Sequence, residues 1–202
     1  YNDSFWGFNE LWMQYYNIIK TANAAVESLD LYAKNISNDN DMKNYKAYRG
    51  EVMFMRAYAY YRLVQAFGSV TILRDNNQID LRRSTANSVN RYALENLQYG
   101  IDNMPRIRPN QSEHKGAVTA FSAEMLAAKI YLNMGNHEMV EKLTDDIIAH
   151  GNFSLYSDFY QLFKIPGKLC DESIFECQMT DFGNGSGDLI DGDKWFVCQG
   201  PN

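Results

Sequence analysis

The stretch from Glu51 to Gly68, EVMFMRAYAYYRLVQAFG, places apolar residues on more than one face of a helix. A helix that is apolar on several sides is buried between neighbours rather than lying on a surface. Its two stripes, at spacings of three and four, are Tyr48, Val52, Met55, Ala59, Leu63 and Ala66, and Phe54, Tyr58, Tyr61 and Val64. Gly68 ends the run where a residue with positive φ fits. We therefore expect a central helix from about Lys43 to Phe67 in an all-helical domain.

Arg56 lies inside this apolar run, between Met55 and Ala57. One interpretation is that Arg56 binds a ligand carboxylate or a sugar hydroxyl. The structural interpretation is the one we favour, because a charge in the middle of a buried helix has to be paired. We expect Arg56 to be buried against a carboxylate of another helix, and the candidates are Glu10, Glu27, Glu95 and Glu124. Asn23, close to the apolar face of the preceding helix, should make an interhelical hydrogen bond.

Apolar residues at helical spacing predict four further helices. Their approximate bounds are Asn9–Lys34, Ser84 or Thr85 to Pro105, Ala117–Met134 and Glu138–His150. Ala128, Tyr131 and Gly135 fit a tetratricopeptide-like pair of antiparallel helices. Such a pair cannot bury its apolar faces alone, so we predict an all-α fold of stacked helical hairpins, an α-α superhelix. The predicted core includes Trp12, Phe54, Tyr58 and Phe121.

Two segments fall outside this helical pattern. The linker 69–83 has little periodicity and is long enough to be functional rather than a mere connection. After Gly151 the helical period ends, and residues 152–202 form a loop-rich extension. Within it, residues 172–178 (ESIFECQ) alternate enough to predict a short strand. We expect a single domain over residues 1–202, with a helical core over 1–151 and a small irregular or β element near the C-terminus.

Residues 51–70 resemble the signature helix of the SusD/RagB family, whose pattern is roughly E-x-x-F-x-R-A-x-x-Y-x-x-L-V-x-x-F-G-x-V-P. The matching residues are Glu51, Phe54, Arg56, Ala57, Tyr60 or Tyr61, Leu63, Val64, Phe67, Gly68 and Val70, and Thr71 stands where the family has proline. Further matches lie in the first helix (Trp12, Ile18, Ala22, Asn23) and in the segment E-x-I-F-E (Glu172, Ile174, Phe175, Glu176). The chain resembles the N-terminal helical-repeat portion of these longer proteins, and we expect it to be truncated at both ends.

The resemblance implies a function without catalysis. Members of the family are surface-exposed lipoproteins of the outer membrane in Bacteroidota-type bacteria. They capture oligosaccharide, or peptide in some relatives, for a SusC-like TonB-dependent transporter, and a lipid anchor outside this chain would hold the protein at the membrane. Two other classes stay open: a helical-repeat adaptor that binds a protein partner, and an all-helical carbohydrate-active enzyme.

Composition and motifs exclude several other classes. Twenty-five acidic residues against nineteen basic ones give a net charge of −6, and no basic stripe is visible, so we expect no nucleic-acid partner. Cys170, Cys177 and Cys198 form no C-x-x-C pair, so we expect thiols, with one disulfide bridge as the alternative. No catalytic or metal-binding motif occurs, and we expect neither a metal nor a cofactor. The acidic loop of Asp188, Asp191 and Asp193 leaves calcium as the alternative, although the EF-hand spacing is missing.

Ligand-facing rings are best sought in loops, because rings on helices are best explained as core. The opening YNDSFWGF holds Trp6 beside Phe5, Asn2 and Asp3, and the tail DGDKWFVCQG holds Trp195 beside Asp193. A ring next to hydrogen-bonding groups is what a sugar site requires, although each tryptophan could equally pack within its own loop. Trp6 is the stronger candidate. By the resemblance, both loops should lie on the same face as residues 69–83.

Overall fold

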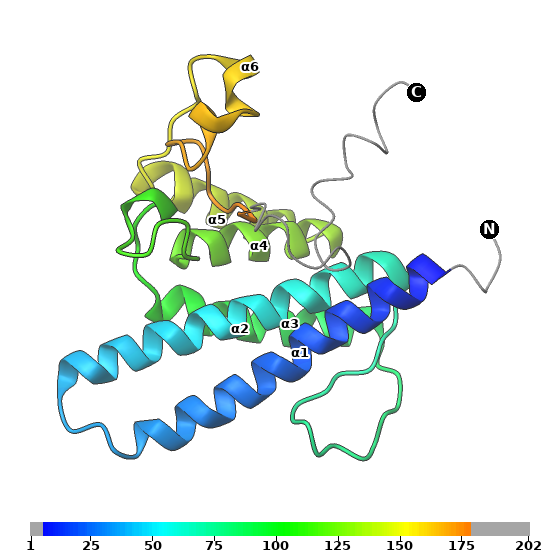
Figure 1. The fold of residues 1–202 in the computed structure, drawn as a ribbon. Helices are drawn as coiled ribbons and strands as arrows, with labels where there is room; N and C mark the ends of the chain where they lie inside the picture. The colour runs from blue at the N-terminus through cyan, green and yellow to red at the C-terminus, as the bar shows by residue number, and fades with distance from the viewer. Residues whose placement is uncertain (1–5, 179–202) are drawn as a thin grey trace, which may run out of the picture.

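The computed structural model of the chain describes residues 6–178, which fold into helices joined by short connections and one longer loop (Figure 1). The α-helices are α1 (Trp6–Ala33), α2 (Asp39–Phe67), α3 (Ala86–Asn103), α4 (Ala120–Asn133), α5 (His137–His150) and α6 (Phe159–Leu162), and the 3₁₀ turns are η1 (Pro109–Gln111) and η2 (Ile165–Gly167). The predicted all-α class is therefore confirmed. No helix in the part of the chain that is described is long and apolar enough to cross a membrane.

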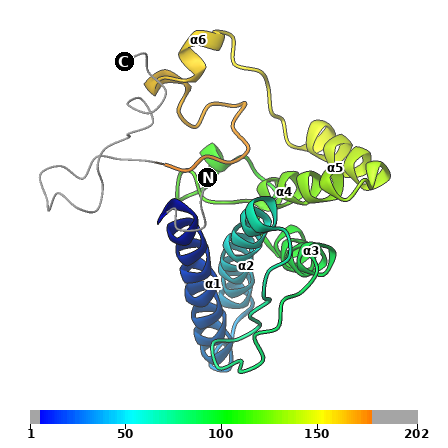
Figure 2. The same cartoon turned by 90° about the vertical axis from the view of Figure 1, so that its right-hand side faces the viewer.

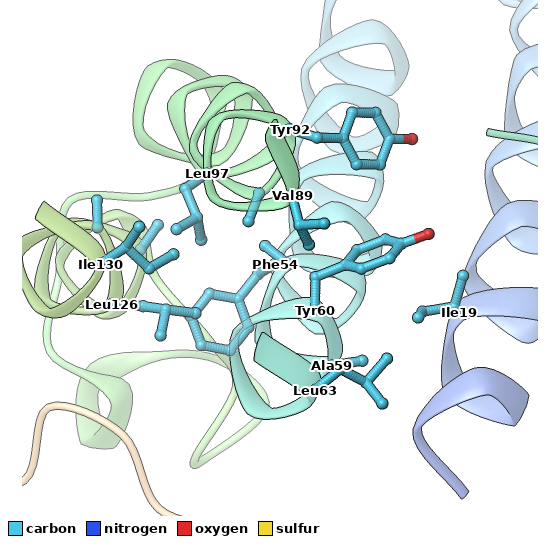
Figure 3. Packing of buried hydrophobic residues seen from close by; sticks show 14 of the residues in the cluster. Ile19, Phe54, Ala59, Tyr60, Leu63, Val89, Tyr92, Leu97, Leu126 and Ile130 are labelled. Atoms are coloured by element: carbon cyan, nitrogen blue, oxygen red, sulfur yellow. The ribbon is translucent and has the colours of Figure 1, made fainter. Parts of the chain in front are cut away.

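Helix α2 occupies the centre, as its sequence predicts. It packs along α1 on one side and α3 on the other, and it also contacts α4, while α5 covers α4 (Figures 1 and 2). Phe54, Tyr60 and Leu63 of α2 are almost completely buried, and they meet side chains from all three neighbouring helices (Figure 3). The consecutive antiparallel pairs α1–α2 and α4–α5 are the stacked hairpins that the hydrophobic pattern predicts.

The predicted stripes on α2 are only partly right. Tyr48 and Met55 belong to a stripe that the spacing predicts to be buried, but they are 49% and 37% exposed. The buried band instead follows Met53, Ala57 and Tyr60, because it is set by the two long neighbours α1 and α3 rather than by the apolar residues alone. Among the predicted core residues, Phe54 and Phe121 are buried, whereas Trp12 and Tyr58 are partly buried at its edge.

Most helix ends follow the local sequence. Asn38 and Thr85 cap α2 and α3, since their side chains accept from the backbone N–H groups of Asp41 and Ser88. Gly68 ends α2 with φ of 70°, the positive value that its position predicts. Helices α2 and α3 cross closely at another glycine: a Cβ on Gly50 would lie 2.7 Å from Met104 Cγ and 3.3 Å from Gly100 Cα.

Two expectations about irregular segments are wrong. The opening was expected to be a loop through Phe8, but α1 already begins at Trp6. Residues 172–178 form no strand, and the one β-type pairing among residues 6–178 is an isolated bridge between Thr71 and Arg83. The alternation in 172–178 instead reflects packing on helices, because the Phe175 ring lies 5.1 Å from that of Phe54.

Candidate functional site

The predicted burial of Arg56 is confirmed, but its predicted carboxylate partner is wrong. Arg56 is 6% exposed. Its Nε and Nη2 donate to Asn96 Oδ1 of α3 at 2.9 and 2.6 Å, and its Nη1 donates to Asn23 Oδ1 of α1 at 2.8 Å. Burial lowers the pKa of Arg56. Two amide oxygens therefore hold a buried cation between three helices, and Asn23 makes the interhelical bond expected of it.

The expected acidic partners of Arg56 are engaged elsewhere or lie at the surface. Glu124 on α4 is 2% exposed and accepts from Arg106, while its Oε2 is buried without a hydrogen-bond partner among the described residues. Burial raises the pKa of Glu124. Arg106 also pairs with Asp146 of α5 and lies 4.7 Å from the centre of the Phe121 ring. This network joins α4, α5 and the segment after α3, which is a structural role.

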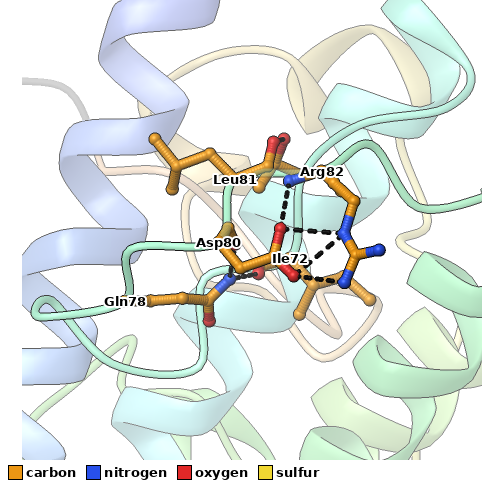
Figure 4. A network of polar contacts seen from close by, with 6 residues as sticks. Ile72, Gln78, Asp80, Leu81 and Arg82 are labelled. Atoms are coloured by element: carbon orange, nitrogen blue, oxygen red, sulfur yellow. Dashed lines mark hydrogen bonds and ion pairs between the residues drawn. The ribbon is translucent and has the colours of Figure 1, made fainter.

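The linker 69–83 is a fixed loop, tied to the core at its base. Buried Tyr60 donates its hydroxyl to the Leu73 carbonyl at 3.2 Å and accepts from the Leu73 N–H at 2.8 Å. Asn76 Nδ2 donates to the Lys20 carbonyl of α1 at 2.9 Å. Further along, Gln78 Nε2 donates to the Ile72 and Asp80 carbonyls, and Asp80 pairs with Arg82 (Figure 4).

Of the predicted site residues, Trp6 is the one whose backbone is described. It begins α1 at the end of the bundle where α2 ends and the 69–83 loop begins (Figure 1). The ring of Trp12 lies edge-on to that of Phe67 at 5.1 Å, which fixes this arrangement. The other predicted site residues lie outside the described residues, namely Phe5, Asn2, Asp3, Trp195 and Asp193.

A cleft of about 630 Å³ lies between α2, α4 and residues 172–177. We call it the aromatic cleft, because Tyr58 and Tyr61 of α2 and Phe175 line it, with Phe54 at its floor. Arg62 and Lys129 add cationic groups to its lining, and Arg62 Nε donates to the Tyr15 hydroxyl of α1 at 3.2 Å. The sequence did not predict this site, because the pattern around Tyr58 predicts a core residue and that around Phe175 a strand. The available signal was Arg62 close in sequence to the rings of Tyr58 and Tyr61.

A second, polar cleft of about 350 Å³ lies between α1 and the turn 74–77 of the loop. We call it the Arg56 cleft. Arg56 lies at its base, and the other polar lining residues are Asn23, Glu27, Asp30, Lys34, Arg74, Asp75, Asn76 and Asn77. Asp30 accepts from Arg49 at 2.8 Å and from the Tyr45 hydroxyl at 2.7 Å. The hydrogen bond from Arg49 lowers the pKa of Asp30, while burial and Asp30 raise the pKa of Tyr45 to about 12.

Neither cleft contains a recognisable metal site. Within residues 6–178 no three His, Cys, Asp or Glu side chains are grouped so that they could hold a metal ion. Cys170 and Cys177 are free thiols in this range. Cys198 and the acidic loop at 188–193 lie outside the described part of the chain, so the calcium alternative stays untested.

Comparison with known proteins defines the class. Residues 3–132 match the SusD-like family described as starch-binding and associating with the outer membrane, and the chain belongs to this family. A SusD-like protein of Bacteroides ovatus is 22% identical over 205 residues, covering 93% of this chain and 34% of that protein. This chain therefore spans about a third of the length of that relative.

Solved structures agree on the fold. Surface glycan-binding protein A from Bacteroides fluxus matches with a TM-score of 0.71 and 23% identity, over 82% of this chain and 35% of that one. A crystal structure with xylogluco-oligosaccharide matches with a TM-score of 0.69 and 22% identity, over 82% of this chain and 34% of that one. The resemblance to the SusD/RagB family is thus confirmed, as is the helical fold.

Proposed function

We propose that this protein binds oligosaccharide at the outer membrane without catalysis and passes it to a SusC-like TonB-dependent transporter. Family membership supports the proposal, because the family is described as starch-binding and associating with the outer membrane. The match to a structure with xylogluco-oligosaccharide supports the class of ligand. The observation that carries the proposal to this chain is the aromatic cleft, where the partly exposed rings of Tyr58, Tyr61 and Phe175 line the same cleft as two cationic groups.

The chemistry of the aromatic cleft suits a sugar. Apolar faces of a sugar ring pack on the rings of Tyr58, Tyr61 and Phe175, and Arg62 and Lys129 supply donors for hydroxyl oxygens. At about 630 Å³ the cleft has the volume of an ordinary small-molecule site. We propose that Trp6 extends this surface at the end of the bundle, together with Phe5, Asn2, Asp3, Trp195 and Asp193.

Calorimetric titration with neutral oligosaccharides tests this proposal. Trp6→Ala and Tyr61→Ala should each weaken binding by about 1–3 kcal/mol, the size of one stacked ring. The melting temperature should change little in Trp6→Ala, whereas Tyr61 also packs against the core, so Tyr61→Ala is titrated below its melting temperature. Tyr48→Ala is the matched control, because Tyr48 is an exposed ring of the same helix outside the cleft. Unaltered binding in both ring variants, or cleavage of the oligosaccharide during the titration, would remove the proposal.

A protein-binding role has one observation in its favour. The segment around α6 and η2 carries large apolar side chains that are mostly exposed: Leu155 86%, Phe159 75%, Phe163 75% and Ile165 89%. It stands away from the helical body (Figures 1 and 2). Exposed apolar patches mark contacts with other macromolecules, so we propose this segment as part of the contact with the transporter. Co-purification with a large outer-membrane barrel, compared between wild-type and Phe159→Asp protein, tests this contact. Capture of soluble partners alone would instead favour a helical-repeat adaptor.

A further inference from the structure

Two arginines line the Arg56 cleft, and they differ in burial: Arg56 is buried, whereas Arg74 is exposed. The Arg56 guanidinium carbon lies 5.5 Å and that of Arg74 lies 4.9 Å from the centre of one and the same ring, Tyr92. Two like charges in one polar cleft repel each other unless an anion lies between or beside them. Arg56 is bonded to neutral amides only, and three of the five N–H donors of its guanidinium are used, which leaves two for a further acceptor.

No carboxylate of the cleft is bonded to Arg56 among the described residues. Asp30 is bonded to Arg49, whose own charge it balances. Asp75 accepts from the backbone N–H of Asn77 at 2.8 Å, and it is exposed, as is Glu27. Arg74 and Lys34, the other cations of the lining, are exposed as well. Water screens these exposed charges of both signs, so Arg56 is the charge of the cleft that is screened least.

The cleft is also built on rigid elements. Asn23 Nδ2 donates to the Leu73 carbonyl and lies 3.4 Å from Asn76 Oδ1, so the turn 74–77 is held against α1. The Tyr60 and Asn76 bonds described above fix the same part of the loop. Side chains on a preorganised loop bind a ligand without first losing conformational freedom, which favours binding over a merely solvated surface.

We propose that the Arg56 cleft binds an acidic sugar, namely a uronic acid residue of an oligosaccharide. The carboxylate accepts two parallel hydrogen bonds from Arg74, in the bidentate geometry that guanidinium groups favour, and the positive charge of Arg56 lies beneath it. Asn76, Asn77 and Glu27 offer the donors and acceptors that sugar hydroxyls require. That the ligand is a sugar rests on the proposed function. The preference for an anion rests on the two arginines alone.

This site is separate from the proposed neutral-sugar surface. Asn23 follows Trp6 by seventeen residues in α1, which places the two about 25 Å apart along the helix axis. A variant at one site should therefore leave the other unchanged. That independence distinguishes failure of this inference from failure of the proposed function.

NMR titration of the 202-residue chain provides the test, with glucuronic and galacturonic acid as probes and glucose and galactose as their neutral counterparts. The acids should bind at least about tenfold more tightly than the neutral sugars, and shift the amide signals of Asn76 and Asn77. Arg74→Gln should remove about tenfold or more of the acid affinity. Arg82→Gln is the matched control, because Arg82 lies on the same loop, paired with Asp80 and outside the cleft.

Several other outcomes would overturn part of the inference, and one would support it. Equal binding of acids and neutral sugars, or an Arg74→Gln protein that binds the acids as before, would show that the cleft has no anion preference. Acetate binding as tightly as glucuronic acid would show an anion site rather than a sugar site. Loss of acid binding in Trp6→Ala would show that the acids occupy the neutral-sugar surface instead. Acid binding retained in Trp6→Ala while neutral oligosaccharide binding is lost would support both sites separately.

Discussion

Replacement of Asn96 by leucine should destabilise the protein by about 3–5 kcal/mol, the range for breaking a buried charged pair. Asn96 is 1% exposed, and its Oδ1 accepts two of the three hydrogen bonds that Arg56 donates to the asparagines. Leucine has a similar size but accepts no hydrogen bond. The guanidinium would then stay buried with a single bond, to Asn23, and each lost bond to a charged group is worth about 1.5–3 kcal/mol.

Removal of the charge itself should cost less. Arg56→Met leaves two amide oxygens without a donor, at about 1–3 kcal/mol for each unsatisfied group, and the methionine regains part of this by apolar burial. In the double variant Arg56→Met with Asn96→Leu, only Asn23 loses a partner. The double variant should therefore be destabilised by less than the sum of the single variants, by at least about 2 kcal/mol.

Urea unfolding followed by far-ultraviolet circular dichroism measures these free energies, provided that the m-value is the same for all variants. Asn103→Leu is the control, because Asn103 Nδ2 makes the same bond to the carbonyl four residues back, that of Tyr99, and bonds no arginine. Single-variant effects that add to within about 0.5 kcal/mol would refute the reasoning. An Asn96→Leu cost no larger than that of Asn103→Leu would do so as well.

Two further predictions concern packing and pH. Gly50→Ala should destabilise the fold by about 1–3 kcal/mol, because its Cβ would overlap Met104 Cγ; Gly100→Ala, which meets only the flexible end of Met104 at 2.9 Å, should cost less in the same unfolding assay. Burial raises the pKa of Glu124 in the folded state above its ordinary value of 4.5. At pH values between 4.5 and the raised pKa, the folded state binds more protons than the unfolded state, so stability should fall as the pH rises through this range. Burial raises the pKa of Glu51 as well, so thermal melts from pH 4 to 8 should show a shallower slope in Glu124→Gln than in wild type; an unchanged slope would contradict the prediction.

The sequence predicted the helices well, because each carries an apolar face of regular period. Arg56 was predicted to be buried for the same reason. Its partners were not, since amide and carboxylate oxygens satisfy a guanidinium in similar geometry, and Asn96 lies forty residues away. The strand predicted at 172–178 failed because an alternating pattern also suits a segment that lies on helices, where Phe175 meets Phe54 and Tyr58.

The candidate sites were less predictable than the fold. The aromatic cleft joins Tyr58, Lys129 and Phe175, which are far apart in the chain and meet only because α2, α4 and the extension are packed together. The Arg56 cleft depends on how a loop without periodicity folds back onto α1, which hydrophobic pattern does not encode. The glycan-binding roles of Trp6 and of the residues near it stay predictions.

The position of Arg56 also bears on the order in which the chain folds. Its bonds reach thirty-three residues back to α1 and forty residues forward to α3. In a hairpin of α1 and α2 formed alone, the guanidinium would make one of its three bonds, so any burial of it there would be poorly compensated. We therefore expect α1 and α2 to gain little stability together until α3 docks, so the three-helix unit should form cooperatively. Its folding barrier should then depend on contacts between residues that are far apart in the chain.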